Sequence, residues 1–461
     1  MELEKRLETT LKAHDQLLHR RVDLLLRTGK LLVESLADTN RVVRNMKRTA
    51  AYLGIPEEKL HINVSFTMLM VNVSDGDYSC TKFQRIEGHG VNMTAISEVS
   101  KLSWRAIEED YTLDKYEEEL EKIRTKKRNY TPWQVAIGAG FACGGFCIQF
   151  GCDWVAFLYA SLAAIIGMRV RHKCNESGLN HYMGIAIAAF VSTILAWAST
   201  LLPQEWTSTP WHPLLACALF IVPGVPLINF VDDMLDNYIQ VGVVRAVNTL
   251  LMVSAMAFGI AFAVKLCHIA DFFPTISMVP HHAYWEYAIA AAISAMGFSM
   301  IFNIQRRLLW VVAIGGIIAV CTRNFVNLGP STDNIGLDMG LVIGSFSGSV
   351  LVSLIAVKAV HWFHVPGHVL TIPSVIPMIP GVLMYRMLFG LINMNVQTID
   401  QVTPLMKAIE SGVNSGLVIM CIALGVAIPN IFGRKYIASS KNKRLAAILK
   451  ERKARGKFVE W

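Results

Sequence analysis

Long apolar stretches separated by short polar loops fill the chain from residue 131 to residue 432. The hydrocarbon core of a bilayer is ~30 Å thick, so a helix that crosses it needs about 20 mostly apolar residues. On this template we predict an α-helical polytopic membrane protein with about ten transmembrane helices. The predicted spans are 133–151, 154–170, 181–202, 212–231, 243–267, 286–304, 307–322, 338–361, 367–391 and 406–432.

Residues 1–130 show a different pattern, with helical and strand-like periodicities of a water-soluble kind, and we predict a cytoplasmic α+β domain here. This segment has no phosphate-binding loop and no nucleophile-and-base spacing, so we expect a regulatory or structural role and no catalytic residues. The predicted elements are a helix through Leu32, a second helix capped by Asp38 or Thr39 and ending at Gly54, a strand at 61–73, an Asp75-Gly76 turn into a strand at 78–86, and helices near 93–108 and 113–125.

Charge is distributed unevenly along the chain. Only 17% of the 461 residues are charged, whereas a soluble protein carries about a quarter. The net charge of +8 comes largely from the segment before the first span and from the tail 434–461, so it does not indicate nucleic-acid binding. Basic residues flank membrane helices on the cytoplasmic side, where they meet anionic lipid. We therefore predict an inner (cytoplasmic) membrane protein with both termini in the cytoplasm and with membrane lipid as a partner.

Short motifs recur in the same order in the two halves of the membrane part. Because five predicted spans per half is an odd number, the second copy must insert with the opposite orientation. Inverted repeats are typical of secondary transporters. We therefore predict a first repeat at 131–270 and a second at 284–433. The matching motifs are 136–140 with 288–292, Gly145-Phe146 with Gly297-Phe298, Phe150 with Phe302, 222–225 with 379–382, and the pair Asn248 and Gly259 with Asn414 and Gly425.

Prolines and glycines interrupt the fourth and ninth predicted spans at corresponding places. A proline inside a helix removes a backbone hydrogen bond, and in lipid the freed groups must be satisfied by protein or by water in a cavity. Paired broken spans therefore indicate a binding site at the midplane, and kinks that serve only helix packing are the alternative. The breaks contain Pro223, Gly224, Val225 and Pro226 in the fourth span and Pro373, Pro377, Pro380 and Gly381 in the ninth.

Polar side chains within or beside the spans complete the candidate site, because such groups are costly in lipid and usually face a cavity or a partner. Asp232, Asp233 and Glu410 are the candidates for carrying a coupling proton. Arg386 is placed to bind a substrate carboxylate. Ordinary helix-end charge, ion pairing and helix–helix hydrogen bonds are the alternatives. The other predicted residues of the substrate path are Asn229, Asn248, Tyr385, Asn414 and Ser415.

Neither the histidines nor the cysteines indicate a metal site or another cofactor. His361, His364 and His368 are close in sequence, but Pro366 and Gly367 interrupt them and no cysteine or carboxylate joins them. We interpret them as interfacial loop histidines. Most of the nine cysteines lie in apolar stretches, where a cysteine behaves as a small hydrophobic residue.

The segment 219–234, LFIVPGVPLINFVDDM, resembles the threonine/serine exporter family, and the resemblance extends to 29–37, 295–303 and 373–381. In some relatives the two halves look to be separate chains, whereas here they are fused. The resemblance implies export of threonine and serine driven by the membrane potential or the proton gradient, and some split relatives are linked to dicarboxylate export. It supplies no established catalytic residues.

The sequence thus predicts a secondary active exporter whose partners are protons and a small polar metabolite, most readily threonine or serine, with homo-oligomerisation left open. A dicarboxylate exporter of succinate-like solutes is the first alternative. A membrane-embedded hydrolase that uses the front domain, and a passive channel, are more distant alternatives.

Overall fold

The computed structural model describes residues 2–74, 79–203, 205–269, 282–330, 334–392 and 402–454. The described chain divides into two compact units. Unit 1 lies within Met1–Lys127, Asp233–Val244 and Phe432–Trp461, and unit 2 within Arg128–Asp232 and Arg245–Ile431.

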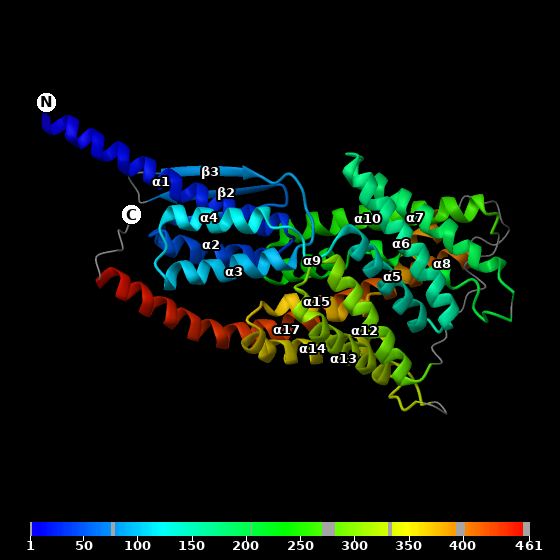
Figure 1. Cartoon of the computed structure of the whole chain (residues 1–461). Coiled ribbons are helices and arrows are strands. Elements are labelled where there is room, and N and C mark those ends of the chain that lie inside the picture. The colour runs from blue at the N-terminus through cyan, green and yellow to red at the C-terminus, as the bar shows by residue number, and fades with distance from the viewer. Residues whose placement is uncertain are drawn as a thin grey trace. The chain divides into compact units, whose positions relative to one another are not determined.

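The N-terminal segment of unit 1 contains four α-helices and a small antiparallel sheet (Figure 1). The strand order is β1-β2-β3, and the register pairs Leu60 with Val73 and Met68 with Arg85. Helix α1 packs against β2 and β3 and also against α2, α3 and α4, so it forms the centre of the unit. The elements are α1 (Glu2–Glu34), α2 (Thr39–Tyr52), η1 (Glu57–Lys59), β1 (Leu60–Val64), β2 (Met68–Ser74), β3 (Ser79–Arg85), α3 (Met93–Glu108) and α4 (Leu113–Thr125).

The hydrophobic pattern explains how the sheet meets the helices. Leu69, Val71 and Val73 alternate along β2 and are fully buried, because successive side chains of a strand point to opposite faces. The predicted helices of this unit are confirmed, and Asp38 caps α2 by accepting a hydrogen bond from the amide of Arg41. The predicted pairing of 61–73 with 78–86 as a hairpin is confirmed by the antiparallel pair β2–β3, but 61–73 is not a single strand.

Residues 61–73 form two strands instead of one. The chain reverses after β1, and the amide of Ser65 donates to the carbonyl of Met68 at 2.8 Å, which closes a turn between β1 and β2. The β-branched composition of this stretch is equally suited to one long strand or to two short ones, so the turn was not visible in it. The predicted Asp75-Gly76 turn lies outside the described residues.

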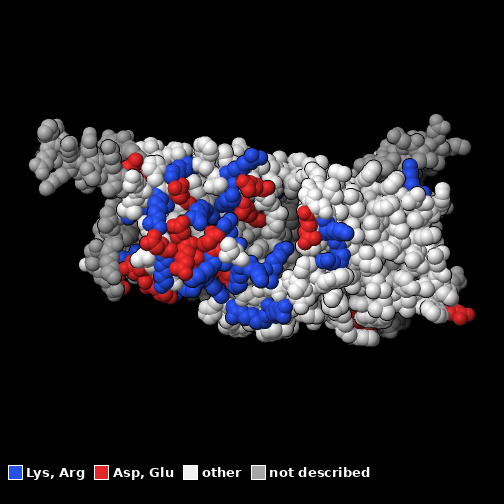
Figure 2. All heavy atoms as spheres, turned by 45° about the horizontal axis from the view of Figure 1, so that its top comes forward, with Lys and Arg blue, Asp and Glu red and all other residues white. Residues whose placement is uncertain are grey.

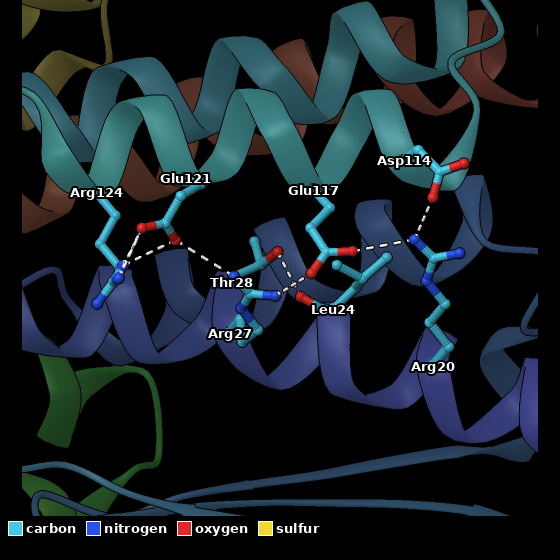
Figure 3. A network of polar contacts seen from close by, with 8 residues as sticks. All are labelled: Arg20, Leu24, Arg27, Thr28, Asp114, Glu117, Glu121 and Arg124. Carbon is cyan, nitrogen blue, oxygen red and sulfur yellow. Dashed lines mark hydrogen bonds and ion pairs between the residues drawn. The ribbon is translucent and has the colours of Figure 1, made fainter.

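A row of ion pairs connects α1 with α4 (Figure 3). Arg20 bonds to Asp114 and Glu117, and Arg27 bonds to Glu117 and Glu121. Hydrogen bonds from Arg20 and Arg27 lower the pKa of Glu117. All of these side chains are more than one-third exposed, so solvent screens the attraction and each pair contributes modestly.

The substitution Glu117→Gln tests this row. A carboxylate with a lowered pKa stabilises the folded state above its unfolded pKa of about 4.3, and that contribution is lost as the pH falls through the lowered value. At neutral pH we expect the free energy of unfolding of the variant to be lower than that of the wild type by about 1 kcal/mol or less, because the ion pairs are exposed to solvent. Thermal unfolding of the full chain at several pH values checks this, and variant and wild type should converge at acid pH.

Glu118→Gln is the matched control, since Glu118 lies on the same helix and pairs with the exposed Lys122 one turn away. It should change the unfolding temperature less than Glu117→Gln does. An equal effect of the two substitutions, or a difference that persists in 1 M salt, would show that the ion pairs to α1 do not stabilise unit 1.

The C-terminal part of the chain also belongs to unit 1. Helix α17 (Val402–Ala454) is 53 residues long and continues well beyond the last predicted span into the predicted tail. Arg444 pairs with Glu108 at 2.7 Å, and Arg452 pairs with Asp110 at 2.6 Å. The basic residues of this segment therefore bind acidic residues at the end of α3, in addition to raising the net charge.

Unit 2 is helical throughout its described part, and its surface in Figure 2 is largely uncharged, whereas charged residues crowd the surface of unit 1. Within it α5 packs on α6 and α12, α12 on α13, and α13 on α14 and α15. Its elements are α5 (Pro132–Gln149), α6 (Trp154–Glu176), α7 (His181–Trp197), η2 (Ala198–Leu201), α8 (Pro213–Ala216), η3 (Leu219–Ile221), α9 (Gly224–Leu235), α10 (Ile239–Leu266), α12 (Tyr284–Ile301), η4 (Arg306–Leu308), α13 (Leu309–Asn327), α14 (Leu341–Phe363), α15 (Gly367–Val375), η5 (Ile376–Met378), α16 (Gly381–Ile392) and the first part of α17.

Six helices of the described chain are long and apolar enough to cross a membrane, or eight when each of two sharply bent helix pairs counts as one span. Large apolar side chains remain exposed along these helices, as Leu158, Leu162 and Ile166 do at helical spacing on α6. Such a stripe is suited to lipid and costly in water. The chain is therefore a polytopic helical membrane protein. Helices α5 and α12 lie where the other two spans were predicted, but they are not among these candidate spans.

Candidate functional site: a pair of broken helices

Two apolar helices of unit 2 bend sharply at a proline. The bend is 58° between η3 and α9, at Val222 and Pro223, and 57° between η5 and α16, at Ile379 and Pro380. A proline ring drives the residue before it out of the helical region. Accordingly, ψ is 123° at Val222 and 130° at Ile379. Both predicted interruptions are thus real breaks, and they lie 157 residues apart.

The backbone follows the same course through both breaks. In the first, the amide of Val222 donates to the carbonyl of Leu219 at 3.1 Å, and the amide of Gly224 donates to the carbonyl of Val222 at 2.8 Å. The residues 157 positions later make the same two bonds, at 2.9 and 2.8 Å. The two segments therefore share a local structure as well as a sequence motif.

The two breaks touch each other, and their contact is reciprocal. A Cβ atom added to Gly224 would lie 2.5 Å from Cδ1 of Ile376, and one added to Gly381 would lie 2.8 Å from Cδ2 of Leu219. Gly381 is the counterpart of Gly224, and Ile376 is the counterpart of Leu219, each 157 residues later. Exchanging the two segments therefore exchanges the two contacts, which is the mark of a local twofold relation. The side chains that meet here are apolar and buried.

Helices α5 and α12 show the same kind of relation. Each is 18 residues long, and α12 begins 152 residues after α5. Just before α5 begins, the amide of Asn129 donates to Oδ1 of Asn303, just past the end of α12, at 2.8 Å. Just past the end of α5, the carbonyl of Cys152 accepts from the ring of His282, just before α12 begins, at 2.8 Å. The two helices therefore run antiparallel.

Glycines let the backbones of these two helices meet. A Cβ atom on Gly145 would lie 2.5 Å from the carbonyl oxygen of Ala290, and one on Gly297 would overlap the carbonyl oxygen of Gly138. Gly145 and Gly297 are counterparts at a spacing of 152, and so are Gly138 and Ala290. This contact is again reciprocal.

Asp232 lies in the last turn of α9, beyond the first break, and is buried. Its Oδ2 lies 3.4 Å from Nε2 of His368, which is also buried, in the first turn of α15. The negative end of the α9 dipole disfavours a charged carboxylate, and the positive end of the α15 dipole disfavours a charged imidazole. Each side chain therefore lies beside a group that can carry the opposite charge.

The interpretation of His368 as an interfacial loop residue is wrong, because it is buried in a helix and faces a carboxylate. His364 ends α14 in a left-handed conformation. In the described part of the chain, no three His, Cys, Asp or Glu side chains come together as a metal site would require.

The other two proton candidates lie in different surroundings. Oδ1 of Asp233 accepts a hydrogen bond from the amide of Thr39 at the start of α2 (2.8 Å). Asp236, one turn later, accepts from the side-chain amide of Asn40 at 2.7 Å. Both contacts lie within unit 1. Glu410 is exposed on α17.

The remaining predicted path residues fall into two groups. Beside the breaks, Asn229 and Tyr385 are buried and Arg386 is half-buried, and the hydroxyl of Tyr385 donates to the carbonyl of Leu215 at 2.9 Å. This bond ties α16 to the end of α8. The other three residues are described by their own surroundings. Asn248 on α10 accepts a 2.7 Å hydrogen bond from the hydroxyl of Tyr182 on α7. On α17, Ser415 is buried and Asn414 is exposed.

Sequence reasoning missed His368 and the buried Arg245 as members of the polar interior. A signal for His368 existed: it is an ionisable residue inside the predicted span 367–391, which is the criterion that selected Asp232. Arg245 lies inside the predicted span 243–267, so the same criterion applied to it; in the structure it is buried on α10.

Comparison with known proteins covers most of the chain. Residues 23–267 match the sequence model of a family described as threonine/serine exporter, and residues 287–432 match a second model, described as Threonine/Serine exporter, ThrE. The chain is 25% identical over 243 residues to a protein of Klebsiella aerogenes named "Probable succinate transporter subunit YjjP", which covers 53% of this chain and 92% of that protein. The YjjP of Escherichia coli (strain K12) is 26% identical over the same length, 93% of that protein. No solved structure matches the chain.

Apolar helices with two contacting broken spans, together with these matches, define a polytopic membrane transporter of the exporter class. The chain belongs to the threonine/serine exporter family, with both family segments in one polypeptide.

Proposed function

We propose that the protein is a secondary active exporter that moves threonine and serine out of the cytoplasm at the expense of the proton motive force. The observation that carries this proposal is the pair of broken helices that touch at Gly224 and Gly381. A broken helix leaves backbone groups available at mid-membrane, and two breaks in contact provide one place where a small solute can be held. The apolar side chains that meet there would close the path in the state described.

We also propose an inverted repeat of five plus five spans, which the same relations support. The reciprocal contacts at both the breaks and the glycine crossing support a twofold axis between the halves. The antiparallel course of α5 and α12 supports an axis that lies in the membrane plane and not along its normal. With these two Gly- and Ala-rich helices counted as spans, the six helices and two bent pairs bring the total to ten.

We further propose that both termini lie in the cytoplasm and that the protein resides in the inner membrane. The basic residues before α5 and in the C-terminal segment support this orientation, because Lys and Arg are retained on the cytoplasmic side. Residues 1–130 would then form a cytoplasmic domain with no catalytic role. A homo-oligomer is compatible with the proposal and is not required by it.

For proton coupling we propose Asp232 among the three candidates. It is buried, it faces His368, and it follows the first break within the same helix. Asp233 already serves as acceptor for the α2 amide, and Glu410 is exposed. A carboxylate that exchanges a proton while its partner imidazole remains in place can couple proton entry to rearrangement of the break.

The substrate path would run past both breaks and use groups of both charges. A zwitterionic amino acid needs a carboxylate for its ammonium group and donors for its carboxylate. Asn229, Tyr385 and Arg386 supply polar groups and donors near the breaks, and Asp232 is the carboxylate there. A dicarboxylate such as succinate is the second candidate, because relatives of this chain carry the name of a succinate transporter subunit.

Flux from vesicles tests the proposal. Purified protein in liposomes is loaded with labelled threonine, serine or succinate, and efflux is measured with and without an imposed pH gradient. We expect efflux of threonine and serine that the gradient accelerates and a protonophore slows. Flux unaffected by the gradient would indicate a passive channel, and efflux of succinate alone would move the substrate assignment to dicarboxylates.

A further inference from the structure

A buried histidine and a glutamate meet at the end of unit 2 where α12 begins. Nδ1 of His282 lies 3.0 Å from Oε2 of Glu286, and the imidazole and carboxylate are both mostly buried. The other ring nitrogen, Nε2, lies 2.8 Å from the carbonyl oxygen of Cys152, just past the end of α5. This histidine therefore bridges the two halves of the protein at one end of the α5–α12 pair.

The geometry fixes the number of protons in this pair. A carbonyl oxygen only accepts, so Nε2 must carry a hydrogen. The contact of 3.0 Å between Nδ1 and the carboxyl oxygen also needs a hydrogen, whether it belongs to an imidazolium or to a protonated Glu286. Either way, the pair holds one exchangeable proton and is neutral as a whole. Loss of that proton leaves one ring hydrogen for two acceptors. The charged carboxylate of Glu286 attracts it more strongly than the carbonyl of Cys152 does, so the lone pair of Nε2 then faces that carbonyl.

The opposite end of the α5–α12 pair has the same side-chain cap at the start of its helix, but Tyr130 and Gln134 stand in place of the histidine and the glutamate. Tyr130 and Gln134 stand 152 positions before His282 and Glu286. The side-chain carbonyl of Gln134 accepts from the amide of Thr131, as Oε2 of Glu286 accepts from the amide of Ala283. Gln134 also accepts from Arg306, whose charge is permanent near neutral pH. One end of the pair can respond to pH through its contact groups, and the other cannot.

The other charged and titratable groups around His282 are few in the described chain. Tyr287 accepts from the amide of His282, and Arg323 on α13 acts electrostatically on Tyr287. Asp153 follows Cys152, and its carboxylate accepts from Thr207, Ser208 and the amide of Ala156. Glu286 is therefore the carboxylate in direct contact with the imidazole of His282.

We propose that His282 and Glu286 form a second proton-binding site, separate from Asp232 and His368, whose occupancy holds this end of the α5–α12 pair closed. This rests on the proposed function, in whose orientation this end faces the outside of the cell. Loss of the proton weakens the link from α12 to α5 and lets this end open for solute release. Histidine is the side chain whose charge ordinarily changes between about pH 5 and 8, so this is the range in which the proposal is tested.

Spin labels provide a test that does not depend on transport. Trp154 at the start of α6 and Trp285 in the first turn of α12 flank the link and are exposed. With labels at these two positions, the distance between them is measured in nanodiscs by double electron–electron resonance from pH 5 to pH 8. In the otherwise native protein, we expect a short distance at pH 5 and a longer, broader distribution at pH 8.

Glu286→Gln should remove this response. The amide nitrogen of glutamine, at the position of Oε2, donates permanently to Nδ1 of His282, so Nε2 keeps its hydrogen on the carbonyl of Cys152 as in the proton-loaded pair; the bond from the amide of Ala283 to this position is given up. We expect the short distance at every pH. Export at pH 8 should fall on the order of tenfold, which corresponds to about 1.4 kcal/mol, because the link from α12 to α5 no longer breaks. Gln134→Glu, the inverse exchange at the other end, keeps both acceptor contacts and should leave the pH response unchanged.

The outcomes separate this proposal from the proposed function. Equal distance distributions at pH 5 and pH 8 in the native background, or a pH response that persists in Glu286→Gln, would overturn the second proton site. Failure of the native protein to export any of the three solutes, with the distance response intact, would count against the exporter assignment and leave the proton site standing.

Discussion

Asp232→Asn is expected to abolish uphill export while leaving exchange of substrate across the membrane. The buried carboxylate of Asp232 faces His368 and follows the first break. Asparagine has nearly the same shape but cannot take up or release a proton, so the path can still rearrange while its coupling to the proton gradient is lost. In loaded vesicles, the gradient-driven accumulation ratio of threonine should fall to about one, and counterflow of labelled against unlabelled threonine should persist.

Asp236→Asn is the control for this substitution. Asp236 lies four residues further along the chain and contacts Asn40, a contact that an asparagine oxygen can maintain. It should retain uphill export. His368→Gln should resemble Asp232→Asn, because it removes the other half of the buried pair. Full accumulation by Asp232→Asn at normal expression would remove Asp232 from the coupling mechanism.

Gly297→Ala is expected to prevent correct assembly of the membrane unit. The added methyl group would collide with the backbone of α5 at Gly138 and Ala142, and backbone atoms cannot rotate away as a side-chain tip can. The two helices must then separate, at a cost of about 3 kcal/mol or more, at the upper end of what overpacking costs. The yield of monodisperse protein and its unfolding temperature after purification measure this effect.

The repeat makes a sharper form of this prediction. Gly145→Ala should cost about as much as Gly297→Ala, because the two glycines are counterparts and each faces a carbonyl of the other helix. Gly416→Ala on α17 is the control, since nothing lies within 4 Å of its added methyl group. Alanine favours a helix over glycine by roughly 0.5–1 kcal/mol, so this variant should be as stable as wild type or slightly more stable. Unequal effects at positions 145 and 297 would weaken the twofold relation.

Features that depend on local chemistry were predictable from the sequence. The broken spans were found because proline and glycine change the backbone wherever they occur, and the bends at Pro223 and Pro380 are of nearly equal size. The helices of unit 1 were predicted for a similar reason, since periodicity and the capping residue Asp38 are local signals.

Features that depend on which elements meet were not predictable. The contact of Asp232 with His368 joins residues 136 positions apart, and hydropathy alone does not indicate which face of α15 is turned to α9. Likewise, the link from Arg452 to Asp110 depends on α17 continuing past the membrane as one helix. A run of charges indicates exposure to water and carries no information on its partner.

The central claim is that the two breaks form one site that opens to each side in turn. In a protein whose native cysteines are replaced, single cysteines at Val222 and Ile379 are exposed to a membrane-impermeant thiol reagent, with threonine supplied first on one side and then on the other. The account predicts that each position reacts from one side at a time and that reversing the threonine gradient reverses the reactive side. If both positions stay unreactive from both sides under every gradient, the breaks are sealed packing elements and not a transport path.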